Sequence, residues 1–176
     1  MLIWVYIHIN HKSISEGLHM SIYHYNFETN WKFEADIEQI WGLINEFNYG
    51  EWWKDKKKKR IKNESTKIAV GDRFMLFFHT KLPYQLAFES EVVKLKSPTY
   101  LEIKAFGELE GQGIWTLSQL GSITHVQYIW RVNTNKKWMN TLAPLLRPAF
   151  VWNHNQVMNE GAKGISTSLG VKLISQ

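Results

Sequence analysis

The chain has 176 residues, of which 44% are apolar and 21% charged, so it suits one globular domain and not a disordered or fibrous chain. It contains no cysteine, which excludes a disulfide framework, thiolate metal sites and a cysteine nucleophile. The 9 Trp, 7 Tyr and 9 Phe favour a thick core or the lining of an apolar pocket.

The formal net charge of +5 comes from one segment, KDKKKKR (54–60). It holds six of the 21 basic residues and one of the 16 acidic ones, so the rest of the chain carries 15 of each. A surface that binds nucleic acid usually spreads its basic residues and interleaves aromatic ones, and we therefore predict no nucleic-acid partner. The run favours a solvated loop. The other interpretation is peripheral contact with an anionic membrane through Lys56, Lys57, Lys58, Lys59 and Arg60.

The apolar run MLIWVYIHI at residues 1–9 is far shorter than the roughly 20 residues of a membrane-spanning helix. It also lacks the basic start and the small-residue cleavage site of a secretory signal. We interpret residues 1–22 as an N-terminal extension, with Met20 as an alternative start, and 23–176 as one domain. A cytoplasmic location is expected.

Residues 23–35 partly alternate between apolar and polar positions and predict a strand. Asp36 is a suitable N-cap for a helix over IEQIWGLINEF (37–47), whose apolar residues follow helical spacing. NYGEWW (48–53) then predicts a second short helix or a turn.

From about 60 to 134 the sequence predicts strands separated by turns. The apolar or alternating runs are RFMLFFHT (73–80), YQLAFESEVVKL (84–95), YLEIKAFGEL (100–109), GQGIWTLSQL (111–120) and THVQYIWRVNT (124–134). Short connections between consecutive strands indicate an antiparallel meander, with GELEGQG (107–113) interpreted as a hairpin. The apolar face of such a sheet needs a cover, and the C-terminal segment is the part of the chain left to supply it.

Residues 136–173 predict that cover as a helix. An apolar stripe at steps of three and four residues comprises Phe150, His154, Val157, Met158, Gly161, Ile165, Leu169 and Leu173. Pro148 fits the first turn of this helix, and Pro144 separates it from an upstream helical turn. The expected element is a kinked or two-part helix.

Four segments carry a resemblance to a known superfamily: WKFEADIEQIWGLINEFNYGEWW, LPYQLAFESEVVKLKSP, ELEGQGIWTL and KWMNTLAPLLRPAFVWNHNQVMNEGAKG. Over about 31–170 the chain resembles the START-like (SRPBCC) superfamily of polyketide cyclase/dehydrase and lipid-transport proteins, in a bacterial cyclase-like branch. The resemblance implies an α+β helix-grip fold. In that fold a curved antiparallel sheet wraps around a long, proline-kinked C-terminal helix, with two short helices near the N-terminus. It also implies an apolar cavity that holds a lipid, polyketide or other hydrophobic ligand.

The candidate lining of this cavity consists of the inward faces of the predicted strands and helix. For the strand at 73–79 the sequence does not distinguish the inward face, because both faces carry apolar residues. The expected lining residues are Phe74, Leu76, Phe78, Leu86, Phe88, Ile103, Ala105, Trp115, Leu117, Tyr128, Trp130, Phe150, His154 and Met158.

No metal-binding spacing, nucleophile motif or phosphate-binding loop occurs, so no metal or cofactor is expected. His154 is the candidate acid or base because it lies on the apolar stripe of the helix. The alternative interpretation is a core histidine that hydrogen bonds to a backbone carbonyl, and this is the one we favour.

Three functions follow from these observations. The first is binding, with or without transport, of a hydrophobic small molecule or lipid. The alternative is a cyclase- or dehydratase-like enzyme that uses His154, with Tyr128 as a further candidate. The third is an interaction protein that is tethered by its lysine run.

Overall fold

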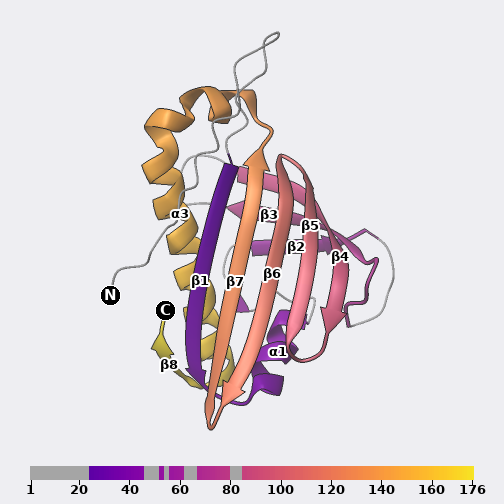
Figure 1. Cartoon of the computed structure of the whole chain (residues 1–176), viewed down its shortest axis with the longest axis vertical. Helices are drawn as coiled ribbons and strands as arrows, with labels where there is room; N and C mark the ends of the chain where they lie inside the picture. Colours follow the sequence, from indigo (N-terminus) through magenta and orange to yellow (C-terminus); the bar gives the residue numbers. More distant parts are fainter. Residues whose placement is uncertain (1–23, 46–51, 54–55, 62–66, 80–84) are drawn as a thin grey trace.

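The computed structural model describes residues 24–45, 52–53, 56–61, 67–79 and 85–176. Within these ranges one eight-stranded sheet has the strand order β2-β3-β4-β5-β6-β7-β1-β8, and every neighbouring pair is antiparallel. Figure 1 shows the sheet curling, so that β2 and β3 cross behind the long strands, with α3 running beside β1. The predicted α+β helix-grip fold is confirmed.

The elements follow one another along the chain in the predicted order, with one additional strand at each end of the sheet. Their bounds are β1 His24–Glu34, α1 Ile37–Asn45, β2 Lys56–Arg60, β3 Arg73–His79, β4 Gln85–Lys96, β5 Tyr100–Gly107, β6 Leu109–Leu120, β7 Ile123–Thr134, α3 Lys137–Leu169 and β8 Lys172–Ser175.

The long strands bury alternate side chains, as the sequence period predicted. Along β7 the buried positions include Val126, Tyr128, Trp130 and Val132, whereas Arg131 is exposed. Because successive side chains of a strand point to opposite faces, this pattern directs one apolar face of the sheet toward α3. The side chains on that face form part of the core.

Helix α1 begins where Asp36 follows β1, and a side chain from β6 completes its N-terminus. Gln119 accepts a hydrogen bond from the Ile37 backbone N–H (2.9 Å) and donates its amide to Asp36 Oδ1 (3.2 Å). Gln119 therefore satisfies one of the amide groups that a helix start leaves unpaired, and it ties α1 to the sheet. The second short helix or turn was predicted at 48–53, and residues 48–51 of it lie outside the described residues.

The lysine run forms a strand and not the solvated loop that we predicted. Residues 56–60 are β2, which pairs with β3 from Lys56 opposite Phe78 to Arg60 opposite Phe74. As the edge strand of the sheet, β2 is a position where lysine-rich sequences prevent further strand pairing. Charge patterning alone does not distinguish such an edge strand from a loop.

Helix α3 is one continuous element that begins at Lys137, so Pro148 does not start it, and both Pro144 and Pro148 lie inside it. The predicted kink is present, and Figure 1 shows the first turns of α3 lying across the direction of the rest. The Trp138 and Phe150 ring centroids are 6.5 Å apart, whereas twelve residues of straight helix rise about 18 Å. Each proline removes a helix hydrogen bond, which permits this bend.

The helix ends earlier than its apolar spacing predicted. Gly170 adopts a left-handed conformation with φ 65°, and the Val171 N–H bonds to the Ser166 carbonyl. This is a C-cap arrangement that favours glycine. Leu173 therefore lies in β8, opposite Phe33 of β1, and not on the helical stripe. None of the helices within the described residues combines the length and the hydrophobicity that crossing a membrane requires.

The predicted hairpin at 107–113 is shorter than expected. Strand β5 ends at Gly107 and β6 starts at Leu109, so Gly111 and Gly113 lie within β6. A Cβ built on Gly111 would lie 2.0 Å from the Arg131 carbonyl oxygen. The glycine thus allows β6 and β7 to approach closely at this point.

Candidate functional site

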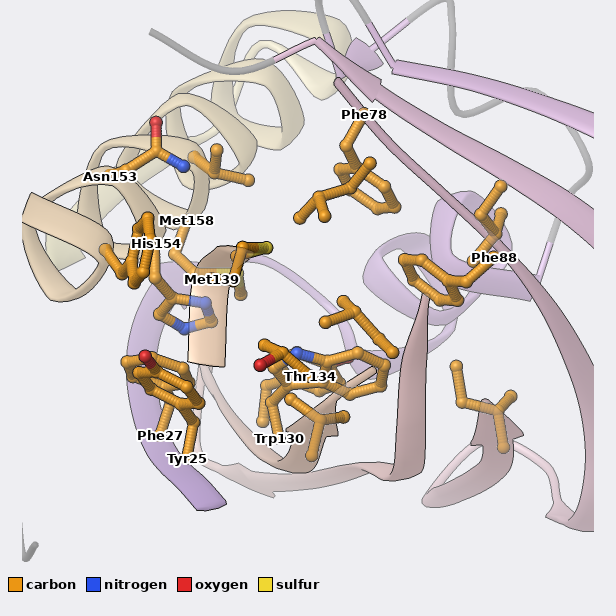
Figure 2. Close-up of a pocket in the computed structure, with 18 of the residues that line it drawn as sticks. Tyr25, Phe27, Phe78, Phe88, Trp130, Thr134, Met139, Asn153, His154 and Met158 are labelled. Atoms are coloured by element: carbon orange, nitrogen blue, oxygen red, sulfur yellow. The ribbon is translucent and has the colours of Figure 1, made fainter. Parts of the chain in front are cut away.

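An apolar pocket of about 130 Å³ lies between the concave face of the sheet and α3. Figure 2 shows its lining side chains converging from β1, the sheet strands and α3. Because α3 is bent, both its first turns, through Met139, and its later turns, through Phe150, His154 and Met158, reach the pocket.

Eleven of the fourteen predicted residues line this pocket: Leu76, Phe78, Leu86, Phe88, Ile103, Trp115, Tyr128, Trp130, Phe150, His154 and Met158. The other three, Phe74, Ala105 and Leu117, are buried in the core and do not belong to the lining. They share the inward face of their strands with lining residues. The alternation of a strand predicts the face of the sheet on which a side chain lies, but it does not predict how far that side chain lies from the pocket.

Nine lining residues were not predicted: Tyr25, Phe27, Trp53, Leu109, Val132, Thr134, Met139, Asn153 and Val157. A sequence signal existed for Phe27, which alternates in phase with Trp31 and Phe33 of β1. No such signal existed for Trp53, because its role depends on packing against α3. Its indole Nε1–H donates to the Val157 carbonyl (3.0 Å).

Nine of the twenty described residues that line the pocket are Phe, Tyr or Trp. Phe78 and Phe88 are stacked with centroids 5.6 Å apart, and Trp130 lies 5.6 Å from Phe88. Trp115 and Tyr128 are stacked at 4.1 Å. Aromatic pairs at these separations hold one another in place, so the walls offer large and rigid apolar surfaces.

His154 extends from α3 into this pocket, and its ring stacks on Phe27 with centroids 3.9 Å apart and planes 13° apart. The residue as a whole is half-buried, but its Nε2 atom is buried and has no hydrogen-bond partner in the part of the chain that the structure describes. Among the described residues no hydrogen bond joins the ring to a backbone carbonyl, so the interpretation we favoured is wrong. The imidazole is held by a ring stack.

Burial lowers the pKa of His154 to about 3, because the protonated ring would lose its hydration. The imidazole is therefore neutral near pH 7, and each of its nitrogens either donates or accepts one hydrogen bond. A buried neutral imidazole can hold a polar group of a ligand, but it has no readily available proton to give.

Two other polar side chains of the lining differ from His154 because they make hydrogen bonds to other protein groups. The Thr134 hydroxyl donates to Asn140 Oδ1, and the Trp53 indole donates to a helix carbonyl. No Asp, Glu, Lys or Arg is among the described residues that line the pocket. Nor do three or more His, Asp or Glu side chains gather in a metal-binding arrangement within the described ranges.

No protein-family model matches the chain, and no curated protein matches it. Solved structures do resemble it. The protein TTHA0849 from Thermus thermophilus superposes with a TM-score of 0.63 at 11% identity, covering 81% of this chain and 98% of that one. A protein of unknown function, SA2116 from Staphylococcus aureus, gives 0.58 at 11% identity, covering 86% and 99%. CalU16 from Micromonospora echinospora gives 0.52 at 14% identity, covering 83% and 79%.

These likenesses extend over most of both chains, but the identities are low. They show a shared α+β fold and nothing more about this chain. Together, the fold and the pocket define a helix-grip α+β protein with an apolar pocket beneath its long helix.

Proposed function

We propose that this protein binds an apolar small molecule in the pocket between the sheet and α3. The observation that carries the proposal is the lining, which is mainly aromatic and aliphatic and has no charged side chain among the described residues. Transfer of an apolar ligand from water to such a surface is favourable, and rigid walls reduce the entropy lost on binding.

The START-like superfamily is the assignment that best fits this proposal. It is supported by the order of elements and by a pocket that lies under a long C-terminal helix. Members of that superfamily hold hydrophobic ligands at this place in the fold. We therefore propose membership, with ligand binding as the function that the resemblance implies.

The size of the pocket restricts the ligand. An engineered apolar cavity of about 150 Å³ in another protein binds benzene. The present pocket, at about 130 Å³, is thus suited to a single ring, and an acyl lipid or a polycyclic ligand would exceed its volume.

The experiment that tests binding is an NMR titration with toluene, supported by native mass spectrometry of protein purified without detergent. We expect saturable shifts of pocket resonances in the wild type and their loss in Leu86→Phe, which fills the pocket. The matched control is Leu95→Phe on the same strand, outside the lining, and it should bind toluene as the wild type does. If toluene causes no saturable shift and no apolar ligand co-purifies, the proposal is wrong.

A second candidate is a cyclase- or dehydratase-like enzyme, which is supported by a buried histidine nitrogen in the pocket. Its neutral imidazole, with a pKa near 3, would be a weak base and would give up no proton near pH 7. In that case His154→Ala would abolish turnover of a hydrophobic substrate and leave folding intact. Binding remains the function that the site supports best.

A further inference from the structure

His154 Nε2 is a buried polar atom in the pocket that has no hydrogen-bond partner among the described residues. Figure 2 shows the imidazole pointing from α3 into the pocket, toward Tyr25 and Phe27 of β1. The stack on Phe27 fixes the ring plane, and a ring nitrogen directs its hydrogen bond within that plane. The pocket therefore contains an oriented hydrogen-bonding position within mainly apolar walls.

A buried polar atom without a partner destabilises a protein, because it has lost its hydration and gained no hydrogen bond in return. Such an atom is explained when a bound molecule supplies the missing hydrogen bond. The side chains of Thr134 and Trp53 do not supply it, because each of them bonds elsewhere in the protein.

The charge of the site indicates which ligand group can make this bond. The described lining has no cation, and the Arg147 guanidinium lies 5.5 Å from the Tyr25 ring centroid but not within the lining. An anionic ligand would lose its hydration and would meet no cationic side chain of the described lining. A cationic ligand would meet no carboxylate of the described lining. The group that bonds to His154 is therefore uncharged.

A hydroxyl group fits better than other neutral groups. It both donates and accepts, so it bonds to Nε2 whether or not that nitrogen carries the proton. The volume of about 130 Å³ and the flat aromatic walls select a single planar ring as the rest of the ligand.

We propose that the ligand class of this pocket is an uncharged monocyclic aromatic molecule whose hydroxyl group hydrogen bonds to His154 Nε2. This inference rests on the proposed function. It adds that the ligand has a single ring, that it is uncharged, and that it hydrogen bonds to His154.

The test compares phenol with toluene, which have nearly the same shape but differ in a hydroxyl and a methyl group. Dissociation constants are measured by NMR titration in the wild type and in His154→Phe, which keeps an aromatic ring at this position and removes the nitrogen. We expect the variant to bind phenol about tenfold more weakly and toluene within about threefold of the wild type. Trp152→Phe is the matched control, because Trp152 is exposed on α3 outside the lining, and it should change neither affinity.

Two further measurements do not depend on the folding of the variant. In the wild type, phenol should shift the ¹⁵N resonance of His154 Nε2, and toluene should leave it in place. Benzoate, as a charged probe, should not bind at pH 7.

The outcomes separate the inference from the proposed function. If toluene binds but phenol neither shifts the Nε2 resonance nor depends on His154, the hydroxyl anchor is wrong and apolar binding stands. If benzoate binds more tightly than phenol, the uncharged ligand class is wrong. If none of the three probes binds and no apolar ligand co-purifies with the protein, both proposals are wrong.

Discussion

His154 combines burial with a titratable ring, and this makes the stability of the protein depend on pH. The folded state keeps the imidazole neutral down to a pKa of about 3, whereas an exposed histidine in the unfolded chain takes up a proton near pH 6.5. Between these values the unfolded state binds more protons. The contribution of neutral His154 is therefore fully present above pH 6.5 and is lost progressively as the pH falls toward 3.

We predict that His154→Phe makes unfolding less sensitive to acid. Relative to the wild type, the free energy of unfolding of the variant should rise as the pH is lowered from 6.5 to 4. Urea denaturation at several pH values measures this difference, with Trp152→Phe as a control that introduces no change in titration. If the free energies of unfolding of the wild type and of His154→Phe changed with pH in the same way, burial of a neutral His154 would be contradicted.

At the residue scale, the sequence predicted the direction of His154 but not its bonding. Helical spacing from Phe150 to Met158 is sufficient to place the ring on the inner face of α3. Its stack on Phe27 joins residues from opposite ends of the domain. Only tertiary packing brings the centroids of those rings within 4 Å and leaves Nε2 without a hydrogen-bond partner among the residues that the structure describes.

At the scale of elements, α3 crosses residues 52–53 so closely that a side chain at one position has no room. A Cβ on Gly164 would lie 1.7 Å from the Trp52 carbonyl oxygen and 2.8 Å from its carbonyl carbon. Both atoms belong to the backbone, which cannot move aside as a flexible side chain can. Glycine at this position therefore determines how near the helix lies to Trp52.

We predict that Gly164→Ala destabilises the protein by roughly 1–3 kcal/mol, although alanine normally favours a helix. The matched control is Gly42→Ala in α1, where an added Cβ meets no atom of the described residues within 4 Å. That variant should stabilise the protein by about 0.5–1 kcal/mol. Chemical denaturation of both variants measures whether the two changes in the free energy of unfolding have opposite signs. If both variants were stabilised equally, the close approach of α3 to the Trp52 backbone would be refuted.

The lysine run belongs to the same scale, because its basic residues occupy the edge strand β2. Contact of Lys56–Arg60 with an anionic membrane stays a prediction. Replacing Lys56–Lys59 with Gln should weaken co-sedimentation with anionic liposomes at low salt, because the surface potential acts within about a Debye length. Changing Lys163 and Lys172 to Gln serves as the control, and unchanged co-sedimentation of the run variant would dismiss the contact.

Helix α3 shows why element boundaries were less predictable than element types. Pro144 and Pro148 were sufficient to predict a kink, because proline lacks the amide hydrogen. The helix nevertheless starts at Lys137 and ends at Leu169, whereas spacing predicted an end near Leu173. Leu169 and Leu173 lie four residues apart, which suits a helix, yet Gly170 ends the helix and Leu173 pairs with β1. Whether such a short segment forms a strand depends on its pairing with β1 and not on the spacing of its own apolar residues.

At the scale of the whole molecule, the described fold begins with β1, which lies between β7 and β8 in the sheet. We predict that a chain starting at Tyr23 unfolds cooperatively and binds toluene as the full chain does. Circular dichroism melts and the toluene titration measure both properties. Loss of cooperative unfolding would show that residues 1–22 belong to the folded domain.

Sequence patterns were sufficient to predict the α+β class, the meander of strands, the inward faces of the strands and an aromatic interior. These properties follow from local periodicity, which needs no knowledge of distant partners. Only the tertiary structure decided that Phe74, Ala105 and Leu117 pack in the core while Tyr25, Trp53 and Met139 line the pocket. Tertiary packing also leaves His154 Nε2 without a hydrogen-bond partner within the described ranges. The physical reason is that a pocket is the space left between elements, and its position depends on how the sheet curls and where α3 bends.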